Sequence, residues 1–307
     1  MKLIGLMPMR NEDWCLGLTL RAALEWCDEV IVRLHGSSDL SHDIVVDLQK
    51  QFGKRLWLIL DKNNDWDEMR HRQSLLEWAR RHQATHIAII DADEILTGNL
   101  LPKIRSVIEE LAPNTILQLP LFNLRGSISR YHSNGIWGNR IVSLAFPDDK
   151  YLHWSGDTFH QREPHGLHLE CFRPLLEAEG GVMHLWGVSE RRLKAKHALY
   201  KITERIRWPA KGIAEIDTYY NHAIGRNPGF APDRRRIAAL IGKPELDVTD
   251  AETWNFADVP PDWWAPYSQW LGFLKPEAEP WQEAECRRLV AEHGRAMVEG
   301  LDLFGVV

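Results

Sequence analysis

The sequence has few of the features that mark secreted, membrane-spanning or nucleic-acid-binding proteins. Its 307 residues include only four cysteines, far apart, which predicts reduced thiols and neither a disulfide framework nor paired zinc ligands. No apolar run reaches 18 residues, so no transmembrane segment is expected. The start has Lys2 and then Arg10-Asn11-Glu12 without the apolar core of a signal peptide, which predicts a cytoplasmic location.

Positive charge is also in short supply. The chain has 37 Lys and Arg against 43 Asp and Glu, a net charge of −6 that argues against nucleic acid as a partner. There is no internal repeat and no low-complexity segment. A chain of this length can hold one large domain with an appendage, or two modest domains.

What the first part of the chain does contain is an alternation of apolar strands and helical stretches. Expected strands cover residues 2–8, 29–34, 55–60 and 86–90, and expected helices cover 16–26, 43–52 and 66–82. Strands alternating with helices predict right-handed crossovers and a mostly parallel sheet with helices on both faces. The predicted fold class is therefore α/β, of the Rossmann type.

The most informative stretch of the chain ends a strand in three acids. The apolar run from Ile87 to Ile90 is typical of a strand buried on both faces, and Asp91, Asp93 and Glu94 follow it. Ligands of open α/β sheets bind outside the carboxyl ends of the strands. Two aspartates one residue apart can place oxygens on one divalent cation, which can hold a diphosphate. The pattern thus predicts a metal site, with solvated acids at a strand end as the plain alternative.

Four elements, in this order, carry a family resemblance. They are Pro8-Met9-Arg10-Asn11-Glu12, Gly36-Ser37-Ser38-Asp39, Arg72-Gln73-Ser74-Leu75-Leu76 and Asp91-Ala92-Asp93-Glu94. They resemble, respectively, the P-x-x-N-E opening, the D-D-G-S-S-D turn, the R-N-x-x-L helix and the D-A-D-E form of the DxD motif of family 2-like glycosyltransferases with the GT-A fold. The resemblance is good over about the first hundred residues and continues more faintly to about residue 210.

The resemblance implies a metal-dependent glycosyltransferase of the hexosyltransferase type. Such an enzyme moves a sugar from a nucleotide-diphosphate donor to a glycan or other hydroxyl acceptor, with Mn²⁺ or Mg²⁺ as cofactor. The residues implied in donor binding are Pro8, Arg10, Asn11, Glu12, Asp39, Arg72 and Asp91. The metal ligands implied are Asp91, Asp93 and His184, which closes a short apolar strand; a core histidine satisfied by a carbonyl is the alternative for His184.

One position departs from the family pattern. Relatives carry one or two aspartates at the end of the second strand, where this chain has Leu34-His35. A neutral imidazole can still hydrogen-bond a base or ribose, but it is not a carboxylate. The nucleotide is therefore open, with uridine diphosphate as the first candidate and guanosine diphosphate as the second.

The catalytic base is expected in the loop that covers residues 154–170. Family habit leads us to expect inversion, in which a carboxylate takes the acceptor's proton as the acceptor attacks. Glu163 is the first candidate, with Asp157 and Glu170 behind it. The alternative for each of the three is a solvated surface acid.

The sequence predicts a division into a catalytic domain over residues 1–210 and a helical, Trp- and Pro-rich extension over 211–307 for acceptor binding or oligomerisation. Expected helices cover 190–207, with Ser189 as N-cap, 213–224, 233–241 and 280–303. The first is basic, which fits a solvated face, attraction to a phosphate or peripheral contact with a membrane surface. Four tryptophans, Trp254, Trp263, Trp264 and Trp270, fit packing of the extension, a homodimer contact or a sugar platform.

Three other classes compete with this interpretation. Asp91 and Asp93 also resemble the motif of haloacid-dehalogenase-like phosphatases, but those place it on their first strand. Sugar nucleotidyltransferases need a Gly-rich opening loop, and residues 8–14 contain no glycine. A non-catalytic nucleotide-sugar-binding protein is the third alternative, which only a measurement of turnover can separate from an enzyme.

Overall fold

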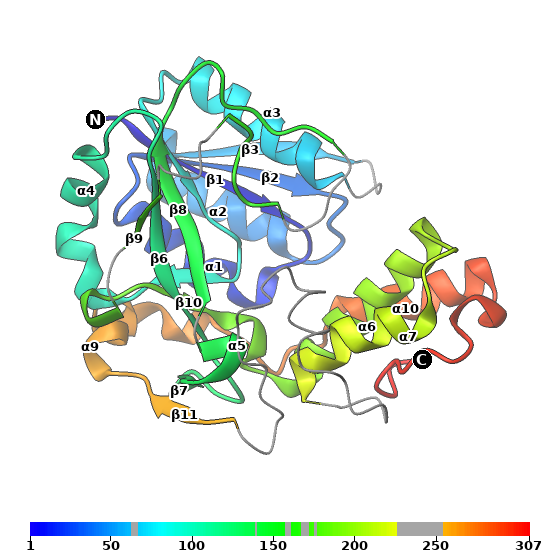
Figure 1. Cartoon of the computed structure of the whole chain (residues 1–307). Helices are drawn as coiled ribbons and strands as arrows, with labels where there is room; N and C mark the ends of the chain where they lie inside the picture. Colours follow the sequence, from blue (N-terminus) through cyan, green and yellow to red (C-terminus); the bar gives the residue numbers. More distant parts are fainter. Residues whose placement is uncertain (63–66, 139, 157–160, 167–171, 175–176, 226–253) are drawn as a thin grey trace. The chain divides into compact units, whose positions relative to one another are not determined.

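The computed structural model describes residues 1–62, 67–138, 140–156, 161–166, 172–174, 177–225 and 254–307 (Figure 1). These residues form two compact units, each assembled from separate stretches of the chain. Unit 1 comprises Met1–Leu121, Ile141–His184 and Pro260–Lys275, and unit 2 comprises Phe122–Arg140, Leu185–Val259 and Pro276–Val307. The predicted boundary near residue 210 stays a prediction, because compactness does not show which part folds by itself.

Unit 1 is built on a large sheet flanked by helices, which confirms the predicted α/β class. Its elements are β1 (Leu3–Met9), α1 (Asp13–Leu24), β2 (Glu29–His35), α2 (Ser41–Phe52), β3 (Leu56–Asp61), α3 (Glu68–Arg81), β4 (His86–Ile89), β5 (Glu94–Leu96), α4 (Leu101–Glu109), β6 (Ile116–Asn123), β8 (Arg140–Pro147), β9 (Phe172–Pro174), β10 (Val182–His184) and α9 (Pro261–Trp264). Among the described residues the strand order is β3-β2-β1-β4-β8-β6-β10-β5, with β9 paired to β6.

The first four strands run parallel, as the alternation of strands and helices predicts. Strand β1 pairs in parallel with β2 and β4, and β2 pairs in parallel with β3, whereas β8 joins β4 antiparallel. Leu3 and Met7 of β1 pack in one apolar core with α1, α2 and α4, while Ile4 and Leu6 pack in a second core with α3. Successive side chains of a strand point to opposite faces, so this alternation buries both faces of the sheet under helices (Figure 1).

Part of the predicted C-terminal extension belongs to unit 1. Helix α9 and the 3₁₀ segment Ala265–Phe273 pack near Gly98, where an added Cβ would lie 2.5 Å from the carbonyl oxygen of Asp262. Trp263 and Trp264 are buried in this segment, which confirms the packing role for these two tryptophans. Glycine is needed at position 98 because the two backbones approach so closely.

Unit 2 is mainly helical. Its elements are β7 (Arg130–His132), α5 (Gly135–Gly138), α6 (Glu190–Arg207), α7 (Ile213–Asn221), β11 (Phe256–Asp258) and α10 (Trp281–His293). Strands β7 and β11 form a small antiparallel pair, and Ala198 and Ile202 of α6 pack against Cys286 and Val290 of α10. None of the helices that the structure describes is both long and apolar enough to cross a membrane.

Two helix ends differ from the predictions. Ser189 precedes α6, but its side chain makes no capping hydrogen bond. The last long helix ends at His293 rather than near residue 303, because Gly294 adopts φ +88° and only a short 3₁₀ turn follows. The predicted helix 233–241 lies outside the described residues. Cys15, Cys27 and Cys286 are free and buried, as predicted.

Candidate functional site

The loops after β1 and β2 are tied together by the residues predicted to contact the nucleotide. Asn11 adopts φ +54°, a left-handed conformation that asparagine tolerates better than most residues. Its Oδ1 accepts hydrogen bonds from the backbone N–H groups of Ser38 (2.7 Å) and Asp39 (3.2 Å). Asp39 in turn accepts from the backbone N–H of Asp13 at 3.0 Å. These contacts hold the loops in place, and their role in donor binding stays a prediction.

The other residues predicted from the opening motif lie at the same end of β1. Pro8 is in the strand itself, Arg10 and Glu12 follow it, and Glu12 accepts a hydrogen bond from Trp14 Nε1 at 2.6 Å. The resemblance assigns all of them to the donor, and each lies at the carboxyl end of a parallel strand, where such sheets bind ligands.

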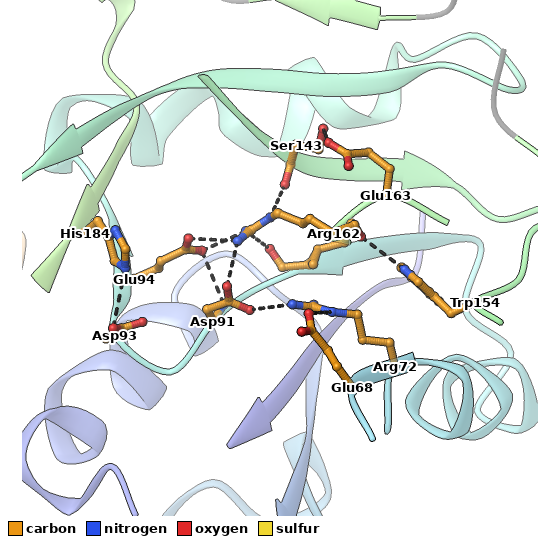
Figure 2. Close-up of polar contacts among 11 residues, drawn as sticks. Glu68, Arg72, Asp91, Asp93, Glu94, Ser143, Trp154, Arg162, Glu163 and His184 are labelled. Carbon is orange, nitrogen blue, oxygen red and sulfur yellow. Dashed lines mark hydrogen bonds and ion pairs between the residues drawn. The ribbon is translucent and has the colours of Figure 1, made fainter. Parts of the chain in front are cut away.

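Arg72 of helix α3 points to Asp91, the first of the two aspartates that follow β4. Arg72 Nη2 lies 3.2 Å from Asp91 Oδ1, and its Nε lies 3.0 Å from Glu68 Oε1, one helical turn earlier (Figure 2). Both Arg72 and Glu68 are buried, at 6% and 8% exposure. The i,i+4 partner therefore orients the guanidinium toward Asp91, and the structure brings these two predicted site residues together.

A second guanidinium, which the sequence did not point to, occupies the centre of the site. Arg162 Nη1 donates a hydrogen bond to Asp91 Oδ2 at 3.1 Å (Figure 2). Two further bonds go to Glu94, from Nη1 to Oε1 at 2.8 Å and from Nη2 to Oε2 at 2.7 Å. The remaining N–H groups of Arg162 donate to the backbone carbonyls of Ile89 (2.7 Å) and Ser143 (2.6 Å). Both oxygens of Asp91 are thus hydrogen-bonded to arginine side chains.

These contacts set the protonation of the cluster. Burial opposes ionisation of Asp91, but Arg72 and Arg162 outweigh it and hold the pKa of that carboxyl below its usual value. Burial would lower the pKa of Arg162, yet Glu94 and Asp91 outweigh it and raise that pKa. Burial raises the pKa of Glu94 and the guanidinium opposes the rise. The bidentate hydrogen bonds describe the ionised pair, which a planar guanidinium favours.

Asp93 points away from the arginines and toward His184. Its Oδ2 lies 3.4 Å from His184 Nε2 (Figure 2). The antiparallel pairing of β10 with β5 causes this approach, since it sets His184 opposite Glu94, the residue after Asp93. The Asp93 side chain is 8% exposed and the His184 side chain 20% exposed. The structure therefore brings together two predicted metal ligands from distant parts of the chain.

The donor set of this pair fits a divalent ion with open positions. A carboxylate oxygen and an imidazole nitrogen are ligands that Mn²⁺ accepts, while Mg²⁺ prefers oxygen alone. Within the described residues no three His, Cys, Asp or Glu side chains come together as a ready-made cage. A metal bound by Asp93 and His184 would therefore need further ligands from a diphosphate or water. That Asp91 is also a direct metal ligand stays a prediction.

Glu163 is the candidate base that the structure places near the cluster. Ser143 donates its hydroxyl hydrogen bond to Glu163 Oε1 at 2.6 Å, and Glu163 follows Arg162 directly in the chain (Figure 2). Trp154 Nε1 donates to the carbonyl of Arg162 at 3.2 Å. The other two candidates, Asp157 and Glu170, lie outside the described residues.

His35, at the end of β2, lies against His71 of α3. The His35 and His71 rings are buried, with centroids 4.4 Å apart, and His71 Nε2 lies 3.7 Å from Asp61 Oδ2. Arg33 Nη2 lies 2.5 Å from the same Asp61 oxygen. Burial, then the charge interactions with His35 and Arg33, lowers the pKa of His71 to about 3, so this ring is neutral at pH 7. Asp61, at the end of β3, thus places a carboxylate beside His71 and Arg33.

Sequence reasoning missed Arg162, Glu68, Ser143 and Asp61. The Glu68–Arg72 spacing of four residues on a predicted helix is a signal that identifies one of them. Nothing local marks Arg162, because its partners Asp91 and Glu94 lie 71 and 68 residues earlier. The basic residues of α6 have partners within unit 2: Arg191 pairs with Glu283, Arg192 donates to the carbonyls of Pro276 and Ala278, and Lys201 pairs with Asp217.

No family model and no curated protein sequence matches the chain. Several solved structures are similar to it in fold. TarS 1–349 from S. aureus in complex with UDP is 13% identical, with a TM-score of 0.45, and the match covers 75% of this chain and 73% of that one. The match to the longer S. aureus TarS structure covers 45% of that chain.

Two further solved structures contain Mn²⁺. The mannosyltransferase PcManGT from Pyrobaculum calidifontis, in complex with GDP-Man and Mn²⁺, is 12% identical with a TM-score of 0.45 over 96% of this chain and 81% of that one. GalNAc-T7 with UDP, GalNAc and Mn²⁺ is 10% identical with a TM-score of 0.38 over 78% and 54%. With TM-scores below 0.5, the function has to be inferred from this chain's own residues.

Proposed function

We propose that the protein is a metal-dependent GT-A-like glycosyltransferase that uses a nucleotide-diphosphate sugar. The observation that carries the proposal is the approach of Asp93 to His184 at 3.4 Å, beside an Asp91 carboxylate that two arginines hold. All three groups lie at the carboxyl ends of strands in one α/β sheet, where such sheets bind ligands. The family resemblance of residues 1–100 assigns this place to the donor diphosphate.

The chemistry of glycosyl transfer explains these residue types. Breaking the bond between sugar and phosphate builds negative charge on the departing diphosphate, and Mn²⁺ or Mg²⁺ bound by Asp93 and His184 would neutralise it. Arg72, fixed by Glu68 and Asp91, adds positive charge at the same place and would orient the nucleotide. Glu163 would accept the proton of the attacking hydroxyl, which makes inversion the expected outcome.

Several details of the proposal rest on the sequence alone. UDP is the first candidate donor nucleotide and GDP the second, and the choice between them is open because His35 stands where relatives have aspartates. The acceptor is a glycan or another hydroxyl compound. We place the reaction in the cytoplasm and assign residues 211–307 to acceptor binding or oligomerisation.

The first experiment is a thermal-stability measurement with UDP, GDP, CDP, ADP and dTDP, each with and without Mn²⁺. A ligand that binds only the folded state stabilises it by RT ln(1 + [L]/Kd), about 2.7 kcal/mol at a hundredfold excess over Kd. We expect one diphosphate to raise the melting temperature, and to do so only with Mn²⁺. No shift with any nucleotide would contradict the proposal.

Turnover separates an enzyme from a binding protein. A panel of sugar nucleotides carrying the diphosphate that binds should show nucleotide release by the unmodified chain, whereas a non-catalytic binding protein would show the thermal shift alone. The phosphatase alternative requires Asp91 to act as a nucleophile. Hydrogen bonds from Arg72 and Arg162 to both of its oxygens make it a poor one.

A further inference from the structure

The side chain of Arg162 has no hydrogen-bond donor left for a substrate. A guanidinium has five N–H donors. Nε donates to the Ser143 carbonyl, Nη1 to Asp91 and Glu94, and Nη2 to Glu94 and the Ile89 carbonyl, at distances from 2.6 to 3.1 Å. Five donors thus meet five acceptors. Arg162 is saturated by the protein itself and has no N–H group to spare for a diphosphate.

These five bonds join three separate stretches of unit 1. Ile89, Asp91 and Glu94 belong to the carboxyl end of β4 and the turn into β5, and Ser143 belongs to β8. Arg162 lies on the segment 161–166. The guanidinium therefore fastens this segment to the strand end that holds the DxD motif (Figure 2).

Glu163 is held by the same strand residue as Arg162. The Ser143 carbonyl accepts from Arg162 Nε at 2.6 Å, and the Ser143 hydroxyl donates to Glu163 Oε1 at 2.6 Å. Gln118 Nε2 donates to that hydroxyl at 3.4 Å, so the hydroxyl proton is directed to the carboxylate. Two consecutive side chains of the segment are thus fixed against one residue of the sheet.

We infer that Arg162 is a positioning residue, which places the Glu163 carboxylate at a set distance from the Asp91–Asp93 pair. Glu94 is its buried counter-charge, at 5% exposure. The inference rests on the proposed function, in which Glu163 accepts the acceptor's proton. Because a shift of about 1 Å between a base and the reacting group can cost about a hundredfold in rate, a rigid tether of this kind is expected to control kcat.

The test compares Arg162→Lys with the unmodified chain and with Arg55→Lys. Lysine keeps the charge but has three donors on one atom, so it cannot span five acceptors. Arg55 is the matched control, because its guanidinium also binds backbone carbonyls, those of Leu24, Cys27 and Asp28, before the start of β2. Arg162→Lys should lower kcat about a hundredfold and leave the Kd for UDP with Mn²⁺ within about threefold; Arg55→Lys should leave both unchanged.

A second variant keeps the test valid if Arg162→Lys unfolds. Ser143→Ala removes the hydroxyl that orients Glu163 and keeps the carbonyl that Arg162 uses. It should lower kcat about tenfold, the effect of losing one hydrogen bond to a charged group, with the same Kd for UDP.

The outcomes separate the positioning role from the proposed function. Full kcat in folded Arg162→Lys, or in Ser143→Ala, would overturn the positioning role while glycosyl transfer by the unmodified chain still stood. A parallel loss of UDP affinity and kcat in Arg162→Lys would also overturn it, since Arg162 would then act through donor binding. An unmodified chain that neither binds nor turns over a nucleotide sugar would overturn the proposed function, and this inference with it.

Discussion

Each unit buries a cation, and the two burials differ in charge balance. In unit 2, Lys201 is fully buried and its Nζ donates to Asp217 Oδ1 (2.8 Å), to Asn221 Oδ1 and to the Asp302 carbonyl (2.6 Å). An ammonium has three donors, so three acceptors that include one carboxylate complete and neutralise it. In unit 1, by contrast, the guanidiniums of Arg72 and Arg162 pair with three carboxylates, Glu68, Asp91 and Glu94. A fourth carboxylate, that of Asp93, pairs with His184 instead. These four carboxylates and two guanidiniums are called the unit 1 cluster.

The difference shows how a structural ion pair is told apart from a ligand site. The Lys201 cluster is closed, and it ties α6 and α7 to the segment around Asp302. The unit 1 cluster has two more carboxylates than guanidiniums, and the Asp91 side chain is 36% exposed. An excess of two negative charges at an accessible strand end is the charge that one divalent cation would neutralise.

The largest expected effect is on the carboxylate of the unit 1 cluster that faces His184. Asp93→Asn should lower turnover about a thousandfold, because a metal supplies several kcal/mol of charge stabilisation. It should also abolish the dependence of UDP binding on Mn²⁺. The melting temperature should change little, since asparagine keeps the size of the buried Asp93 side chain and Asp93 belongs to neither apolar core of unit 1. Unchanged turnover would remove Asp93 from the metal site.

Breaking the unit 2 cluster should affect stability instead. Lys201→Met leaves Asp217 without its cation in a buried place and should cost about 3–5 kcal/mol of unfolding free energy. Arg191→Ala is the control on the same helix, because the Arg191 side chain is 54% exposed in its pair with Glu283 and should cost about 0–1 kcal/mol. Urea unfolding measures both, and equal costs would contradict the structural role of Lys201.

Removing Arg72 should weaken donor binding. Arg72→Ala takes away one of the two guanidiniums on Asp91 and breaks the ion pair between Arg72 and Glu68. We expect the Kd for UDP with Mn²⁺ to rise about tenfold to a hundredfold, the effect of losing a charged hydrogen bond of about 1.5–3 kcal/mol. Titration calorimetry gives this Kd directly, and an unaltered value would exclude Arg72 from the donor site.

Both units should also contribute to a pH dependence of stability, which is gradual rather than abrupt. Burial lowers the pKa of His71 in unit 1 and of His132 in unit 2 to about 3, from 6.5. Between pH 6.5 and about pH 3 these two histidines therefore bind more protons in the unfolded chain than in the folded one, so their contribution to stability is level above pH 6.5 and falls as the pH drops through this range. Each histidine contributes at most about 1.4 kcal/mol per pH unit.

Urea unfolding between pH 7.5 and 5 checks this dependence. His71→Gln and His132→Gln should each flatten the fall of the unfolding free energy with acidification, because a glutamine binds no proton. A curve as steep as that of the unmodified chain would show that the replaced histidine is not the source.

Local patterns were sufficient to predict the first four strands of the large sheet and the helices between them. The four predicted strands correspond to β1 to β4, and each predicted helix between them begins and ends within a few residues of α1, α2 or α3. The reason is that a strand buried on both faces needs an unbroken apolar run, and an amphipathic helix needs its own period. Polar site residues follow directly after such an apolar run, so the sequence also placed Asp91 and Asp93 at the end of a strand.

The C-terminal part of the chain was harder to predict, because the place of its segments depends on contacts with residues far away in the sequence. The stretch 260–275 was expected to belong with a C-terminal extension, but its backbone packs against Gly98 in unit 1. The last long helix ends at Gly294 rather than near residue 303. A composition rich in Trp and Pro predicts burial without saying against which surface.

The sequence by itself therefore determined the α/β class, the order of the first strands and the carboxylates at the end of β4. Only the tertiary structure decided which side chains meet them: that Arg162 binds both oxygens of Glu94 and one oxygen of Asp91, and that His184 approaches Asp93. It also decided that Asp61, at the end of β3, lies beside His71. The physical reason is that periodicity records which face of an element is buried, a property of neighbouring residues, whereas an ion pair across 68 residues depends on the path of the whole chain between its partners.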